Sequence, residues 1–210
     1  MGRLSGVSLL ALLRRNGPSG FGFASTAEEV TAGVDLRGRV ALVTGSTSGL
    51  GRESARALAL RGARVLMLAR DEARARAAIA TLRAALGDGP TLTPIACDLG
   101  EPASVRACLE RLLRLELPID IVLGNAGIMA LPRAVTRHGL ELQFLTNHVG
   151  HFMLVTGLLG RLTARARVVM VSSSAHAQTP PGGVQLDNLD GGRDYHRWRF
   201  YGQSKLANLL

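Results

Sequence analysis

The chain has 210 residues, of which 47% are hydrophobic and 4% aromatic, enough for one domain with a sizeable core. Its formal net charge is +9, and all 25 of its basic residues are arginine except Lys205. The arginines are scattered and often neighbour acids, without the basic stripe and interleaved aromatics of a nucleic-acid groove. The composition therefore argues against nucleic acid as a partner.

The first part of the chain lacks a regular pattern. A short apolar run flanked by arginines in residues 3–15 is similar to a weak targeting segment, but it is far too short to cross a membrane. A helical pattern begins at a cap near Thr26. We expect residues 1–34 to form an N-terminal extension, disordered in part, and residues 35–210 to form the domain. The expected compartment is the cytoplasm, with organelle targeting by residues 1–20 as the alternative.

From residue 39 onward, short apolar runs alternate with helical patterns. The runs predict strands over 40–43, 65–68, 92–96, 119–123 and 167–171. The helical patterns predict helices over 50–61, 71–86, 101–115, 138–162 (broken or bent around Gly150 and Gly157) and from about 197 to the end. Strands that alternate with helices form a parallel sheet through right-handed crossovers. The sequence thus predicts an α/β fold, a doubly wound, Rossmann-like parallel sheet of about five strands.

The turn after the first strand reads Thr-Gly-Ser-Thr-Ser-Gly-Leu-Gly over residues 44–51. Glycines let backbone amides approach a ligand, and the following helix presents free N–H groups and its positive end to a pyrophosphate. Between a buried strand and a helix, this pattern predicts a dinucleotide site rather than a mere tight turn. The expected phosphate-binding residues are Gly45, Ser46, Thr47, Ser48, Gly49, Leu50 and Gly51.

The end of the second strand bears on the choice of dinucleotide. An acid there would bond the adenosine ribose and repel a 2′-phosphate, but the strand ends with Ala69 followed by Arg70. Because a guanidinium can clamp a phosphate, NADP(H) is favoured over NAD(H). Two alternatives stay open: Arg70 pairs with Asp71 or Glu72 at the surface, or Asp71 reaches the ribose.

The last predicted helix carries Tyr201 and Lys205, which lie on one face at a spacing of i and i+4. A phenol has a reference pKa near 10. A nearby ammonium favours the phenolate, so that the tyrosine can exchange a proton with a carbonyl or alcohol oxygen. Tyr195 and Arg199 share the spacing, but arginines are so frequent that this pairing is expected by chance. Lys205, the one lysine that an arginine-rich sequence retains, points to a role that a guanidinium cannot fill.

Polar residues also follow the fourth and fifth strands, at the edge of the sheet where ligands bind. Ser172 to Ser174 can orient a substrate oxygen or simply start a loop. The Asn-Ala-Gly run at 125–127 would place a small, polar backbone beside the nicotinamide half. Asn147 lies in an apolar helix face, where it disfavours helix and must bond another group.

Metal ligation is not expected. His148, His151 and His176 lack suitable spacing and an accompanying carboxylate cluster. Cys97 and Cys108 lie outside any Cys-x-x-Cys pattern and are expected to be buried, reduced thiols.

These motifs together resemble the signature set of the short-chain dehydrogenase/reductase superfamily, over a stretch from about residue 35 to the end. The matching residues are Thr44, Gly45, Gly49, Gly51, Asn125, Ala126, Gly127, Asn147, Ser173, Tyr201 and Lys205. The sequences Leu-Thr-Asn-His-Val-Gly-His-Phe over 145–152 and Tyr-Gly-Gln-Ser-Lys-Leu-Ala-Asn over 201–208 are similar to those of its retinol-dehydrogenase-like branch.

The resemblance implies specific roles. Tyr201 would be the acid/base, Lys205 would assist it and hold the nicotinamide ribose, Ser173 would orient the carbonyl and Asn147 would support a proton-relay water. The contact to adenine would come from Asp98, with Leu99 beside it. The complete expected cofactor-binding set is Gly45, Ser46, Thr47, Ser48, Gly49, Leu50, Gly51, Arg70, Asp98, Leu99, Asn125, Ala126, Gly127, Tyr201 and Lys205.

The chain departs from the family pattern in two ways. Gly124 stands where members often have a second asparagine, and the sequence stops five residues after Lys205. Members continue with two further strands and a substrate-covering segment, so we expect a fragment whose fifth strand is a bare sheet edge.

The leading hypothesis is an NADP(H)-dependent reductase or dehydrogenase of a small carbonyl or alcohol. The alternatives are a catalytically inactive dinucleotide-binding fragment or scaffold and, less favoured, a nucleic-acid-binding protein. Pairing into homo-oligomers is left open.

Overall fold

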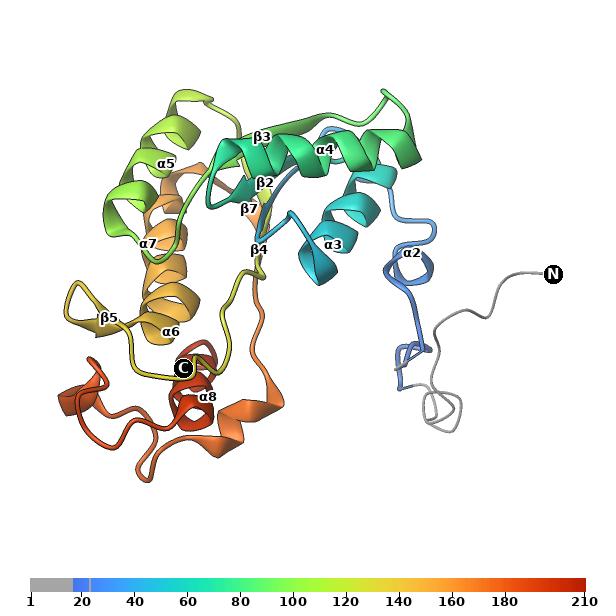
Figure 1. Cartoon of the computed structure of the whole chain (residues 1–210). Helices are drawn as coiled ribbons and strands as arrows, with labels where there is room; N and C mark the ends of the chain where they lie inside the picture. Colours follow the sequence, from blue (N-terminus) through green and yellow to red (C-terminus); the bar gives the residue numbers. More distant parts are fainter. Residues whose placement is uncertain (1–16, 23) are drawn as a thin grey trace.

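The computed structural model describes residues 17–22 and 24–210, so the apolar run in residues 3–15 lies outside the described part. Five parallel strands form its centre (Figure 1). They are β1 (Val40–Thr44), β2 (Arg64–Ala69), β3 (Leu92–Ala96), β4 (Ile119–Gly124) and β7 (Leu162–Met170). Their order across the sheet is β3-β2-β1-β4-β7, and each neighbouring pair is parallel. The carboxyl ends of all five strands therefore lie at one edge of the sheet.

Helices cover both faces of this sheet, which confirms the predicted doubly wound α/β fold. The longer helices are α3 (Gly49–Leu60), α4 (Glu72–Leu86), α5 (Pro102–Arg114), α7 (Gly150–Gly157) and α8 (Arg197–Ala207). The shorter elements are α2 (Ala27–Val30), the β5 (Thr136–Arg137) and β6 (Leu140–Glu141) ribbon, α6 (Leu142–Phe144), a π turn (Leu145–Val149) and three 3₁₀ turns (Leu159–Arg161, Ser174–Gln178 and Leu186–Asn188). Within the described ranges, none of the helices is both long and apolar enough to cross a membrane.

Alternate residues of β1 belong to two separate cores. Leu42 packs with Leu66 and with the buried residues of α5 and α7 on one face. Val43 packs with Met67 and with the buried residues of α3 and α4 on the other face. Figure 1 shows these two helix pairs on opposite sides of the strands. Burial on both faces explains why the strands read as continuous apolar runs rather than as an alternating pattern.

The predicted helix over 138–162 is wrong at both ends. Residues 136–141 form the β5–β6 ribbon, and the turn between its strands places His138 (φ 52°) and Gly139 (φ 75°) in the left-handed region. Two consecutive positive φ values define the tight turn that matches the twist of a hairpin, so the helix cannot start there. At the other end the helix stops at Gly157, and Leu162 already pairs with Ile119. The predicted strand over 167–171 consequently begins five residues earlier, at Leu162.

The break or bend predicted around Gly150 and Gly157 coincides with an irregular segment that ends at Gly150 and with the end of α7 at Gly157. The backbone widens into the π turn Leu145–Val149, which ends where α7 begins at Gly150. Such turns insert an extra residue into the helix and often occur at functional sites. Asn147 is at the middle of this turn.

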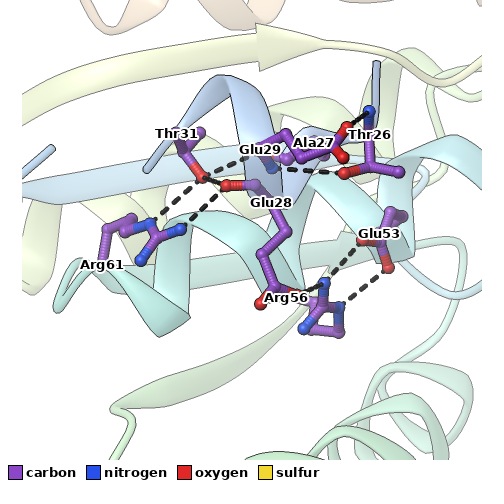
Figure 2. Close-up of polar contacts among 8 residues, drawn as sticks. All are labelled: Thr26, Ala27, Glu28, Glu29, Thr31, Glu53, Arg56 and Arg61. Carbon is purple, nitrogen blue, oxygen red and sulfur yellow. Dashed lines mark hydrogen bonds and ion pairs between the residues drawn. The ribbon is translucent and has the colours of Figure 1, made fainter. Parts of the chain in front are cut away.

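The short helix α2, near the start of the described residues, is hydrogen-bonded to side chains of α3 and of the residue that follows it (Figure 2). Thr26 and Glu29 form a reciprocal capping box at its start, with N···O distances of 3.2 and 2.8 Å. The Glu28 carboxylate pairs with Arg56 of α3 at 2.7 Å, and Arg61 donates to the Glu28 carbonyl at 2.8 Å. The second half of the expected N-terminal extension is thus bonded to the helix that follows the glycine-rich turn.

Candidate functional site

The glycine-rich turn packs closely against the residues that follow β4. Gly45 (φ 63°) and Gly49 (φ 52°) adopt left-handed backbone conformations. A Cβ added to Gly51 would lie 2.3 Å from the Gly45 carbonyl oxygen and 2.4 Å from Nδ2 of Asn125, so only glycine fits. A Cβ on Gly49, in contrast, would meet no atom within 4 Å, and the space there is open to a ligand.

A cavity of about 440 Å³ lies beside this turn, at the carboxyl edge of the sheet. The expected cofactor residues that line it are Gly45, Thr47, Ser48, Leu50, Gly51, Arg70, Asp98, Leu99, Asn125, Ala126 and Gly127. The lining also includes residues outside the expected set, namely Thr44, Leu68, Ala69, Arg74, Cys97, Ile128 and Thr146, whereas Gly49, Tyr201 and Lys205 of that set are not part of it. Ser46 turns away, because its hydroxyl donates to the Leu68 carbonyl at 3.2 Å. The size and lining suit an elongated ligand with phosphate groups.

One end of the cavity carries positive charge. Arg70 and Arg74 line it after β2, and Arg70 is exposed with no ion pair among residues 17–22 and 24–210. The carboxylate of Asp71 caps α4 by accepting from the Arg74 backbone N–H at 2.8 Å and from its Nε at 2.9 Å. Glu72 bonds Arg76 and Arg111. Neither acid pairs with Arg70, which leaves its guanidinium available to a ligand.

Another part of the lining comes from the segment after β3, the strand next to β2. Asp98 is fixed there, because its backbone N–H donates to Oγ of Ser104 and its Oδ1 accepts from the Gly100 N–H, both at 2.9 Å. Cys97 lines the cavity beside it, and both Cys97 and Cys108 are free thiols. A hydrogen bond to Cys108, followed by burial, raises the pKa of Cys97. Its sulfur therefore stays protonated and acts as an apolar wall rather than as a nucleophile.

Tyr201 and Lys205 lie on one face of α8, one turn apart, as predicted. The Lys205 ammonium is 5.9 Å from the centre of the Tyr201 ring and donates to the Val171 carbonyl at 2.8 Å. Burial lowers the pKa of Lys205. A Cβ on Gly127 would lie only 3.5 Å from Nζ of Lys205, so the ammonium sits next to a residue that lines the cavity. Lys205 therefore lies between α8, the helix that carries Tyr201, and the cavity.

Ser173 starts the 3₁₀ turn that packs against the same helix. Its hydroxyl caps this turn by accepting from the Ala175 N–H at 3.2 Å. The close packing requires Gly202, since a Cβ there would lie 2.4 Å from the Ala175 carbonyl oxygen. The segment after β7 is therefore held directly beside the helical turn that carries Tyr201.

Asn147 is fully buried and bonds two separate segments. Its Oδ1 accepts from the Ile128 N–H at 2.8 Å, and its Nδ2 donates to the Ile128 carbonyl and to Oγ of Ser204, both at 2.9 Å. The side chain thus connects the loop after β4 to α8. Support of a relay water, which the resemblance implies, stays a prediction.

Tyr195, the second tyrosine, belongs to a different polar network. Its hydroxyl donates to the Leu131 carbonyl at 2.9 Å and accepts from Nε2 of Gln143 at 3.1 Å. Burial, followed by the charge of Glu141, raises the pKa of Tyr195 to about 12. This phenol holds the loop after β4 in place and is unsuited to proton exchange at neutral pH.

The three histidines considered for metal binding do not form one ligand cluster. No three His, Cys, Asp or Glu side chains of the described ranges are grouped as metal ligands. His151 is instead buried between β1 and the π turn, with Nε2 2.9 Å from Oγ1 of Thr44 and Nδ1 3.0 Å from the Asn147 carbonyl. Burial, aided by the charge of Lys205, lowers the pKa of His151 to about 4.

This buried imidazole predicts a dependence of stability on pH. The pKa of His151 is about 4 in the folded chain, against an ordinary 6.5, so the unfolded state binds the proton more tightly. The contribution is fully present above pH 6.5 and is lost as pH falls toward 4, by about 3 kcal/mol. Chemical denaturation across this pH range should show that loss, and a His151→Phe variant should lack this part of it. Parallel pH profiles for the two proteins would contradict the prediction.

Comparison with known proteins agrees with the resemblance seen in the sequence. The short chain dehydrogenase family model matches residues 39–185. The chain is 40% identical over 203 residues to the chloroplastic short-chain dehydrogenase TIC 32 B of Brassica napus, covering 92% of this chain and 62% of that protein. It is 41% identical over 182 residues to retinol dehydrogenase 12 of Mus musculus, covering 86% of this chain and 56% of that protein. It therefore spans less than two thirds of the length of either relative.

A solved structure gives the same result for the fold. The short chain dehydrogenase from Escherichia coli CFT073 complexed with NADPH superposes with a TM-score of 0.60 at 25% identity. The match covers 82% of this chain and 68% of that chain.

Proposed function

Since this chain belongs to the short-chain dehydrogenase family, we propose that it is an NADP(H)-dependent oxidoreductase that acts on a small carbonyl or alcohol. One observation carries the proposal: the Lys205 ammonium lies beside Gly127, a residue that lines the cofactor cavity. The pair formed by Tyr201 and Lys205 is therefore next to that cavity. A bound nicotinamide dinucleotide would supply or accept the hydride.

The residues of the cavity fit such a dinucleotide. The open space over Gly49 gives a phosphate access to the backbone. Ser48 precedes α3 without a capping bond from its side chain, so the amides of the first turn are free for an anion. Asp98 and Leu99 would border the adenine, and Gly127 the nicotinamide side.

The protein's own groups would perform the proton chemistry. Tyr201 would donate its phenolic proton to the carbonyl oxygen during reduction, or accept the proton of an alcohol during oxidation. Lys205 would stabilise the phenolate by its charge and hold the nicotinamide ribose. Ser173 would orient the substrate oxygen, and Asn147 would keep α8 and the loop after β4 in register and support the relay water.

We propose NADP(H) rather than NAD(H) because of the charge at the adenosine end. Ala69 provides no acid for the ribose, Arg70 has no partner of its own in the described chain, and Asp71 is occupied by Arg74. A 2′-phosphate there would gain charge-assisted hydrogen bonds. The NADPH complex of the Escherichia coli relative supports the same choice.

This choice predicts the effect of an Arg70→Gln substitution. Loss of charge-assisted bonds worth about 1.5–3 kcal/mol should weaken NADPH binding about 10- to 100-fold and leave NADH binding nearly unchanged. Titration of intrinsic or cofactor fluorescence gives both dissociation constants. Arg76→Gln is the matched control, because Arg76 bonds Glu72 and does not line the cavity. An equal loss for both cofactors would contradict the assignment of the 2′-phosphate to Arg70.

A turnover assay tests the proposed function as a whole. The chain is mixed with NADPH and a panel of aldehydes, ketones and retinoid aldehydes, and cofactor consumption is recorded. We expect consumption with at least one carbonyl. Tight NADPH binding without turnover of any carbonyl would favour the alternative, a non-catalytic dinucleotide-binding protein.

We propose the cytoplasm as the compartment, since the two cysteines are unpaired thiols. The chloroplastic relative makes an organelle the alternative. The location of a fluorescent protein that carries residues 1–20 at its N-terminus distinguishes the two.

A further inference from the structure

His151 contacts Thr44, which lies 107 residues before it in the sequence, and also contacts Asn147 of the π turn. It lies on α7, is 1% exposed, and reaches Thr44 at the end of β1 on one side and the carbonyl of Asn147 in the π turn on the other. The side chain of His151 does not line the cofactor cavity and has no role in the proposed proton chemistry.

The partners of His151 determine its protonation. A carbonyl oxygen only accepts, so Nδ1 must carry the proton that is donated to Asn147. Nε2 is then unprotonated and accepts from the Thr44 hydroxyl. Oγ1 of Thr44 also lies 3.4 Å from the Leu123 carbonyl, but its contact with Nε2 is shorter, at 2.9 Å. Burial lowers the pKa of His151 to about 4, so the imidazole is neutral at pH 7 and its Nε2 can accept the hydroxyl proton.

Both hydrogen-bond partners of His151 are themselves bonded to residues of the proposed site. Oγ1 of Thr44 accepts from the Ala126 N–H at 2.9 Å, and the Thr44 carbonyl accepts from Nδ2 of Asn125 at 3.0 Å. Asn147 holds Ile128 and, through Ser204, the helix of Tyr201 and Lys205. One unbroken chain of hydrogen bonds thus runs from the glycine-rich turn to α8.

We propose that His151 is a positioning residue that keeps the cofactor turn and the Asn147 turn in register, so that the cavity and the Tyr201 helix form one site. This inference rests on the proposed function. It predicts that the loss of His151 weakens dinucleotide binding although His151 does not touch the dinucleotide.

The test compares NADPH dissociation constants of folded variants. His151→Phe fills the space and removes both bonds, and Thr44→Val removes the hydroxyl. We expect each to weaken NADPH binding about tenfold, and the double variant to lose little more than either single one, because groups in one network are not additive. His138→Asn is the control, because this exposed ring bonds Glu101 and does not line the cavity, and it should bind NADPH as the unaltered chain does.

Unchanged NADPH binding by a folded His151→Phe variant would overturn the proposal and show a role in stability alone. If that variant does not fold, His151→Asn, which keeps a donor for the Asn147 carbonyl, serves in its place. In the unaltered chain, ¹⁵N NMR of the histidines should show the Nδ1–H form of one buried ring at pH 7, and the Nε2–H form would also overturn the proposal. Absence of NADPH binding by the unaltered chain would instead end the proposed function, and this inference with it.

Discussion

Replacement of Tyr201 by phenylalanine should reduce the rate of carbonyl reduction by about 10²- to 10⁴-fold, the usual contribution of a positioned general acid. The variant loses only the phenolic oxygen. Its ring keeps its buried place on α8 and its edge contact with Trp198, so the fold and the NADPH dissociation constant should stay close to those of the unaltered chain. Single-turnover NADPH oxidation separates the chemical step from cofactor binding.

Tyr195→Phe is the matched control for this experiment. It removes a phenol from the same polypeptide segment, but one that is bonded to Leu131 and Gln143 and whose pKa is raised to about 12. The chemical step should be nearly unaffected by it. Equal rates for Tyr201→Phe and the unaltered chain would remove Tyr201 from the mechanism.

The second large effect is expected from Gly51→Ala. The new Cβ would be 2.3 Å from the Gly45 carbonyl oxygen and 2.4 Å from Nδ2 of Asn125, and the first of these is backbone that cannot rotate away. Overpacking of this kind costs about 1–3 kcal/mol of unfolding free energy. Because the displaced atoms are the cofactor turn itself, NADPH binding should also weaken by about tenfold or more. Denaturant titration and fluorescence titration measure the two effects.

Gly160→Ala provides the control, since a Cβ at that position meets no atom within 4 Å. It should leave both the unfolding free energy and NADPH binding unchanged. Normal NADPH binding by Gly51→Ala would show that the turn does not hold the dinucleotide.

The sheet was predictable because its signals are local. The run Val-Leu-Met-Leu over 65–68 is buried on both faces, and such runs, each followed by a helical pattern, leave a parallel sheet as the simplest arrangement. The turn around Gly51 was predictable for the same reason, since strand, glycines and helix are contiguous. The Tyr201 and Lys205 pair needed only the spacing of one helical turn.

Other features depend on contacts that no local pattern encodes. The turn at His138 and Gly139 interrupts a sequence that otherwise fits a helix, because histidine tolerates a positive φ better than most residues and glycine adopts it freely. Arg74 reaches the cavity only because α4 begins beside it. The bond between Thr44 and His151 arises from the packing of α7 against β1, and spacing along the chain gives no sign of it.

Transfer of a labelled hydride tests the central claim most directly. The chain is incubated with a reducible carbonyl and with NADPH that carries deuterium at either face of nicotinamide C4, and the alcohol is examined by mass spectrometry. We predict that one of the two labelled cofactors yields an alcohol with deuterium on the carbinol carbon. Unlabelled alcohol from both, or no alcohol from a chain that binds NADPH, would contradict the account.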